Sequence, residues 1–182
     1  MDPVYVRKVA NFTSISKENK FDKATFDAKK TLEEIPKKSP KLQTLLDNIK
    51  ELDKKDEKEQ GKLFKHFIFS EVKQGGFGAK VITSGLISYR YKLAYDKKIN
   101  LLSDNELKQT KSNNFLLLCS TDVYGNNITV KKKKAILDKY NQRPENSYGD
   151  LARIIVLDGG FMEEGIKIFI KFIFLLCVLY VL

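Results

Sequence analysis

Two glycine-rich turns carry the residue types that could contact a phosphate group. Residues 75–80 read GGFGAK, and residues 158–165 read DGGFMEEG with two adjacent carboxylates. A glycine turn that exposes backbone N–H groups at the start of a helix is a natural anion site. Neither turn has the spacing G-x-x-x-x-G-K-[ST] or G-x-G-x-x-G. Direct phosphate contact and a tight turn that serves packing alone therefore both remain open.

Other groups give little support for catalysis. The single histidine, His66, lies between Lys65 and Phe67, where a structural or exposed role is favoured over a general base. Ser70 and Ser120 have no histidine within reach by pattern. Cys119 and Cys177 are far apart and lack a second ligand at metal spacing, which favours neither a disulfide framework nor a zinc site. The sequence predicts no catalytic residue, no metal and a reducing environment.

The composition favours a polyanionic partner. The chain has 182 residues, a formal net charge of +10 and 42% hydrophobic residues, which suits one domain with an arm or tail. Nucleic acid is the first candidate partner and an acidic membrane surface the second. The first residues lack the apolar core of a secretory signal.

The first part of the chain divides at Ser39. Residues 1–38 are polar and lysine-rich without a sustained period, and we interpret them as an arm that borders or extends the core. Ser39 and Pro40 are typical of an N-cap and a first helical position. Apolar residues then follow at helical spacing: Leu42, Leu45, Leu46, Ile49 and Leu52. The charged residues 53–61 are predicted to be a solvated helix end and linker.

From residue 65 onward, buried strands alternate with helices in three cycles. Each cycle begins with an apolar run (KHFIFS, NNFLLLCS or LARIIVLD) and passes through a turn to a helical pattern. The predicted helices are residues 81–91, residues 131–140 and a short helix around residues 163–166. The alternation predicts an α/β fold with a mainly parallel sheet flanked by helices. Lys131 to Lys134 form a basic run, for which a solvated face and a nucleic-acid patch are both open.

Three ordered motifs carry a family resemblance: KHFIFSEVKQGGFGAKVITSGLI, NNFLLLCSTDVYGNNITVKKKKAIL and YNQRPENSYGDLARIIVLDGGFMEEGI. Together they resemble the C-terminal motor lobe of superfamily-two helicases encoded by large DNA viruses, including mimivirus-like helicases and the poxvirus early transcription factor and termination helicases. The resemblance covers roughly residues 39–175, with an arm at 1–38 and an apolar tail at 176–182. It implies a partial RecA-like lobe of the P-loop NTPase type.

The resemblance implies a lobe that works only with a second one. In such motors ATP and magnesium bind between two lobes, and the first lobe supplies the phosphate loop. This chain has no such loop, so ATP and Mg²⁺ are expected only with a separate first lobe. The implied nucleic-acid contacts, with single-stranded DNA or RNA, are Lys73, Lys80, Arg143, Asn146 and Gly160. Pairing of Arg143 with a carboxylate is the structural alternative. The implied nucleotide-coupling residues are Asp158 and Gly165.

The sequence departs from the family after the third motif. Relatives read Gly-Ile-Asp where this chain reads Gly165-Ile166-Lys167, and the arginine-finger motif is replaced by IKFIFLLCVLYVL. This tail is shorter than a membrane-spanning helix. Three interpretations of this segment remain open: a buried parallel strand, out-of-frame sequence and a weak tail anchor. A membrane partner is disfavoured.

The expected function is therefore a fragment of a viral ATP-dependent helicase used in transcription, in the virion or host cytoplasm. The alternative is a non-enzymatic, basic nucleic-acid-binding module or a weakly membrane-anchored remnant.

Overall fold

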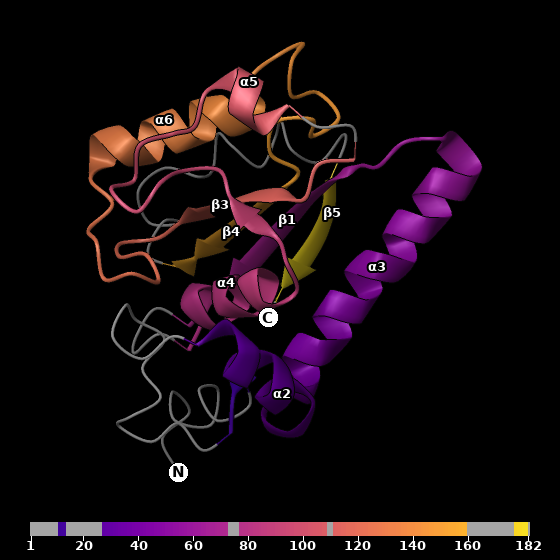
Figure 1. Ribbon diagram of the computed structural model, residues 1–182, viewed down its shortest axis with the longest axis vertical. Helices are drawn as coiled ribbons and strands as arrows, with labels where there is room; N and C mark the ends of the chain where they lie inside the picture. Colours follow the sequence, from indigo (N-terminus) through magenta and orange to yellow (C-terminus); the bar gives the residue numbers. More distant parts are fainter. Residues whose placement is uncertain (1–10, 14–26, 73–76, 109–110, 160–176, 182) are drawn as a thin grey trace.

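The computed structural model describes residues 11–13, 27–72, 77–108, 111–159 and 177–181 (Figure 1). Its centre is a five-stranded sheet in the order β2-β3-β4-β1-β5, and every pair of neighbouring strands is parallel. The strands are β1 (Lys65–Ser70), β2 (Lys92–Leu93), β3 (Asn114–Leu118), β4 (Ile154–Asp158) and β5 (Cys177–Val181). The predicted α/β fold with a parallel sheet is confirmed, as are the three predicted strands at β1, β3 and β4.

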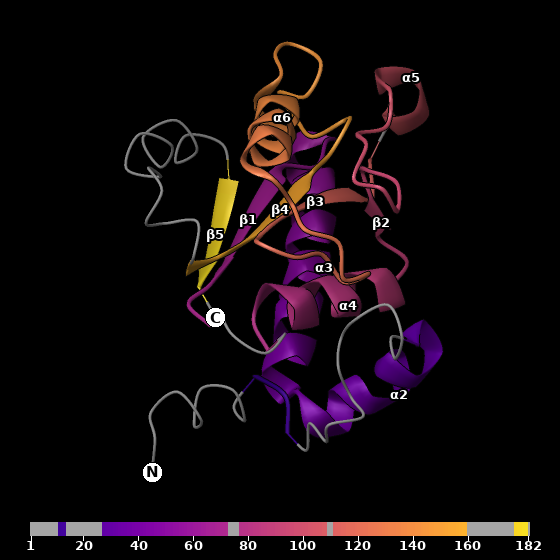
Figure 2. The ribbon, with the colours of Figure 1, turned by 90° about the vertical axis from the view of Figure 1, so that its left-hand side faces the viewer.

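The helices cover both faces of this sheet. They are α2 (Ala28–Lys38), α3 (Pro40–Gln60), α4 (Ala79–Ser88), α5 (Asp104–Leu107) and α6 (Val130–Asn141). The chain passes from β1 through α4 to β2 in one direction across the sheet, and from β3 through α6 to β4 in the other. Because parallel crossovers are right-handed, α4 and α6 must lie on opposite faces. Figures 1 and 2 show this arrangement, with the strands side by side between the two helices.

The core lies between the sheet and these helices. Every residue of β3 and β4 is buried, as expected for strands that are covered on both faces. α4 contributes Val81, Ile82 and Leu86, and α6 contributes Ile136. Helical spacing in the sequence predicted these helices correctly, because their apolar residues face the sheet.

The N-terminal segment contributes more to the core than its polar composition suggests. Phe12 and Ile35 are buried in the core, and Asn11 Nδ2 donates to the Phe77 carbonyl oxygen at 2.9 Å. α2 is capped by Asp27, whose side chain accepts from the backbone N–H of Lys29 at 2.9 Å. The segment predicted as an arm thus includes a helix that packs against α3 and α4.

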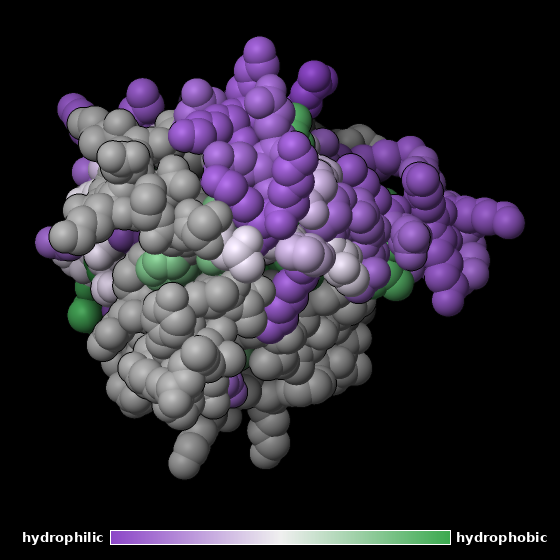
Figure 3. Space-filling model, turned by 90° about the horizontal axis from the view of Figure 1, so that it is seen from below, coloured by the Kyte–Doolittle hydropathy of each residue, from purple (hydrophilic) through white to green (hydrophobic). Residues whose placement is uncertain are grey.

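α3 begins as predicted and extends further than predicted. The Ser39 side chain accepts from the Leu42 N–H at 3.3 Å, which confirms Ser39 as the N-cap. The helix continues to Gln60 and ends at Gly61, which has φ of 69°. Residues 53–60 form the mostly exposed end of this helix as predicted, but they are not a linker, since the helix continues through them and Asp53 and Glu57 form ion pairs with Arg153 and Lys111. Figure 3 shows the mostly hydrophilic outer surface on this side of the molecule.

The end of the chain adds an edge strand. β5 pairs with β1 in parallel, with Lys65 opposite Cys177 and Phe69 opposite Val181. Of the alternatives for the apolar tail, a parallel strand is present at Cys177–Val181, and residues 168–176 lie outside the described residues. The short helix predicted around residues 163–166 lies outside the described residues. Among the helices that the structure describes, none is long and apolar enough to cross a membrane.

Candidate nucleic-acid interface

The carboxyl ends of the central strands meet at one edge of the sheet. β1 ends at Ser70 and β4 ends at Asp158, and these two residues are direct neighbours in the parallel register. Ser70 is fully buried and Asp158 is 8% exposed. In open α/β sheets this edge is where ligands bind. The predicted coupling residue Asp158 therefore lies at the edge where a ligand is expected.

Gly78 brings the start of α4 close to this edge. A Cβ atom added at Gly78 would lie 2.0 Å from the Val72 carbonyl oxygen and 3.0 Å from Ser70 Oγ. Only glycine fits this approach, because the nearest contact is with backbone. Lys80 follows two residues later in the first turn of α4, where its side chain is half-buried. The close packing of Gly78 against the end of β1 thus fixes where α4 begins, and with it the position of Lys80.

Cys119 directly follows β3, whose last residue Leu118 pairs with Leu157 of β4. Burial raises the pKa of the Cys119 thiol to about 12, with a further increase from the Asp158 carboxylate and a decrease from the Lys80 ammonium. The Cys119 S–H also donates to the Thr121 carbonyl oxygen at 2.9 Å. Both charged groups thus act electrostatically on one buried thiol. Lys80, in the first turn of the helix after β1, and Asp158, at the end of β4, thus lie at the same edge of the sheet.

The thiol of Cys119 is therefore expected to be unreactive while the protein is folded. Disulfide exchange requires the thiolate, which is scarce at pH 8 when the pKa is near 12. In a Cys177→Ser background, a chromogenic aryl disulfide should modify the native protein on the order of 100-fold more slowly than the protein unfolded in urea. Equal rates in both states would contradict the burial of Cys119.

Arg143 and Asn146 lie at the opposite edge of the sheet. Both belong to the loop between α6 and β4, at the amino end of β4. Asn146 is fully buried, and its side chain donates to the carbonyl oxygens of Tyr140 and Ala152 at 2.9 and 3.0 Å. It also accepts from the N–H groups of Leu151 and Ala152 at 2.9 and 3.0 Å.

These contacts correct the nucleic-acid role predicted for Asn146. Its amide is fully used within the protein, so the structure gives it a structural role instead. Arg143 is exposed, and among the described residues it forms no ion pair with a carboxylate. It precedes the cis peptide bond to Pro144. The predictions for Lys73, Gly160 and Gly165 lie outside the described residues.

The amino edge contains a buried charged cluster that the sequence analysis missed. Arg153 is 1% exposed and binds the Asp53 carboxylate through both terminal nitrogens, at 2.6 and 2.9 Å. His66 Nε2 lies 3.1 Å from the same carboxylate, which supports the structural role expected for the histidine. A pocket of about 80 Å³ next to Arg153 is lined by Lys62, Lys111, Ser112, Tyr148 and Asp150, among others.

Two loops of the same construction follow the neighbouring strands β2 and β3. Asp96 and Asp122 each accept two backbone N–H bonds through Oδ1 and an asparagine Nδ2 bond through Oδ2, at 2.8–3.1 Å. The residue before each asparagine is left-handed: Ile99 has φ of 60° and Gly125 has φ of 79°. The shared pattern D-x-x-x-N, visible as DKKIN and DVYGN, is the sequence signal that could have identified both loops.

Comparison with protein-family models, with curated proteins and with solved structures finds no match for the chain. The fold itself defines an α/β protein with an all-parallel sheet and a polar carboxyl edge. Within the described residues, no group of three histidine, cysteine, aspartate or glutamate side chains could hold a metal ion.

Proposed function

We propose that the chain is the second motor lobe of an ATP-dependent nucleic-acid helicase of the kind found in large DNA viruses. It binds single-stranded nucleic acid, and it contributes to ATP hydrolysis only when a first lobe supplies the phosphate loop and magnesium site. The cellular setting that follows from the resemblance is the virion or the host cytoplasm, in viral transcription.

The observation that carries the proposal is the convergence of the helicase-like motifs at one edge of the sheet. The first and third motifs contain β1 and β4, whose ends Ser70 and Asp158 are neighbours in the register. Lys80 of the first motif lies at the start of α4, the helix that follows β1, and therefore at the same edge of the sheet as Asp158. The strand order β2-β3-β4-β1-β5 is compatible with a RecA-like lobe and differs from the two common dinucleotide- and flavin-binding orders.

The first test is a charge reversal at Lys80. Phosphate contacts are electrostatic and sequence-independent, so Lys80→Glu should weaken binding to a labelled pyrimidine single strand by about ten-fold in about 50 mM salt. The slope of log affinity against log salt should fall by about 0.7. Fluorescence anisotropy over a salt series measures both quantities.

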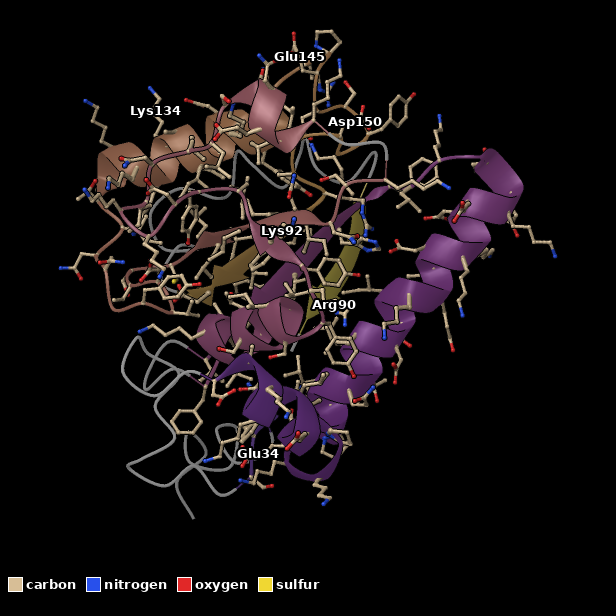
Figure 4. The ribbon with its side chains drawn as sticks, in the orientation of Figure 1. Glu34, Arg90, Lys92, Lys134, Glu145 and Asp150 are labelled. Atoms are coloured by element: carbon tan, nitrogen blue, oxygen red, sulfur yellow. The ribbon has the colours of Figure 1, made fainter. Side chains whose placement is uncertain are left out.

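Lys92→Glu is the matched control, because Lys92 is exposed at the start of β2, away from the carboxyl edge (Figure 4). It should change the affinity by about two-fold or less. An equal loss in both variants would show that only net charge matters and would remove Lys80 from the interface.

A second candidate, a basic binding module without motor activity, is favoured by the net charge of +10 and by the lack of any phosphate loop in the sequence. ATP hydrolysis separates the two candidates. A motor lobe should increase the phosphate release of a first lobe in the presence of Mg²⁺ and a single strand, whereas a binding module should add nothing.

A further inference from the structure

Six lysines gather where the two D-x-x-x-N loops meet the start of α6. The loops contact each other, because Asn126 Nδ2 donates to the Lys97 carbonyl oxygen at 2.8 Å. α6 joins them through Lys132, whose Nζ donates to the Lys98 carbonyl oxygen. We call this group the lysine surface, and its members are Lys97, Lys98, Lys131, Lys132, Lys133 and Lys134.

The positive charge of the lysine surface is poorly balanced within the protein. Lys97, Lys98, Lys131 and Lys134 are exposed, and none of them forms an ion pair in the part of the chain that the structure describes. The two loops and the first turn of α6 offer only the carboxylates of Asp96 and Asp122, which already accept the hydrogen bonds of their own loops. Figure 4 shows Lys134 on the outer side of α6.

The supporting backbone is fixed before any partner binds. Each loop is closed by an antiparallel bridge, Tyr95 with Leu101 and Thr121 with Asn127. The Thr129 side chain caps α6, and no acidic residue follows in the first turn. Clustered positive charges at the positive end of a helix repel one another and oppose the helix dipole. A bound polyanion would relieve this repulsion with little loss of backbone entropy.

We propose that the lysine surface binds the phosphate backbone of single-stranded nucleic acid. The choice of nucleic acid as partner rests on the proposed function, whereas the location follows from the charges and contacts above. α6 and α4 lie on opposite faces of the sheet, so the lysine surface and Lys80 lie on opposite sides of its carboxyl edge. Among the residues that the structure describes, Val130 is the one large hydrophobic side chain exposed next to these lysines, which is too little apolar area for membrane insertion.

The test is the double charge reversal Lys131→Glu/Lys134→Glu in the full chain. Two lost phosphate contacts should lower the salt slope of single-strand binding by about 1.4, and the affinity in about 50 mM salt by about 30-fold or more. The probe is a labelled pyrimidine single strand of about 20 nucleotides. Glutamate at position 131, in the first turn of α6, is favourable for the dipole, whereas glutamate at position 134 faces Asp138 four residues later, so the thermal midpoint should change little. Misfolding then cannot explain a loss of binding.

Lys55→Glu/Lys58→Glu is the control, because these exposed residues have the same spacing of three on α3 and the same change in net charge. A change of about two-fold or less is expected. The proposal is wrong if the α6 variant binds like the unchanged protein, or if the control loses as much affinity. Binding to phosphatidylserine vesicles that depends on Lys131 and Lys134, without binding to the strand, would also overturn it in favour of a membrane partner.

The Lys80→Glu variant separates the two proposals. If Lys80→Glu weakens strand binding and the α6 variant does not, the lysine surface is wrong and the proposed function stands. If only the α6 variant weakens binding, the lysine surface stands and the interface placed at Lys80 is wrong.

Discussion

Asp53→Ala is expected to lower the free energy of unfolding by about 3–5 kcal/mol, because it leaves the buried Arg153 guanidinium without its carboxylate. The guanidinium is held by two bonds to Asp53, at 2.6 and 2.9 Å, and by one from Nε to the Ser112 carbonyl oxygen at 3.0 Å. Asp53 is on α3 and Arg153 immediately precedes β4, so the pair also fixes the second half of α3 against the amino edge of the sheet. Urea unfolding followed by circular dichroism measures the change.

The control for Asp53→Ala is Glu59→Ala, which removes an exposed carboxylate from the same helix. Its effect should stay within about 0.5 kcal/mol. The double variant Asp53→Ala/Arg153→Met should be more stable than Asp53→Ala alone, because it removes the unpaired buried charge. Equal stability of Asp53→Ala and Glu59→Ala would contradict the importance of the pair.

The elements that sequence reasoning predicted well are those whose burial is visible in a short window. β1, β3 and β4 are apolar runs because both of their faces are covered, and the start of α3 is marked by Ser39 and Pro40. β2 has two residues and α5 has four, which is too short for any periodicity. α2 was missed because much of its surface is polar and only Thr31 and Ile35 are buried.

The buried charged cluster at the amino edge of the sheet was harder to predict, because its contacts join residues that are distant in sequence. Asp53 and Arg153 are separated by 100 positions, and no local pattern links them. Most charged stretches at the end of a helix are solvated, which is why a solvated end was predicted for α3. One residue in this stretch, Asp53, instead pairs with the buried Arg153. The paired loops depend on left-handed residues, and Ile99 in this conformation is unexpected because a β-branched residue there costs about 1–2 kcal/mol.

The family resemblance assigns Arg143 and Asn146, in the loop before β4, to the same nucleic-acid interface as Lys80 and Gly160. However, β4 separates the loop that contains Arg143 and Asn146 from the edge where Asp158 lies. β4 runs from Ile154 to Asp158, and a strand rises about 3.3 Å per residue, so its two ends are about 13 Å apart. Residues before a parallel strand lie at the amino edge and residues after it at the carboxyl edge. The predicted strand alone was enough to separate the two groups.

Asn146→Ala is expected to destabilise the protein by about 3 kcal/mol or more, since it removes hydrogen bonds from buried backbone groups of Leu151 and Ala152. The Tyr140 carbonyl oxygen keeps a partner, because it also accepts from Lys65 Nζ. Asn105→Ala is the control, because Asn105 is exposed on α5, and its effect should stay within about 0.5 kcal/mol. Urea unfolding again provides the measurement.

Asn146→Asp tests the same contacts through charge. The aspartate keeps the acceptor for the two N–H groups, but its carboxylate would face the carbonyl oxygens of Tyr140 and Ala152 without a proton to donate. Burial and these oxygens favour the protonated form, so the pKa of the new carboxyl group should rise above its value in the unfolded chain. The loss of stability should therefore be smaller near pH 4 and grow as the pH rises to 7. If Asn146→Ala is instead as stable as the unchanged protein but binds nucleic acid weakly, Asn146 acts at the interface after all and the structural role is wrong.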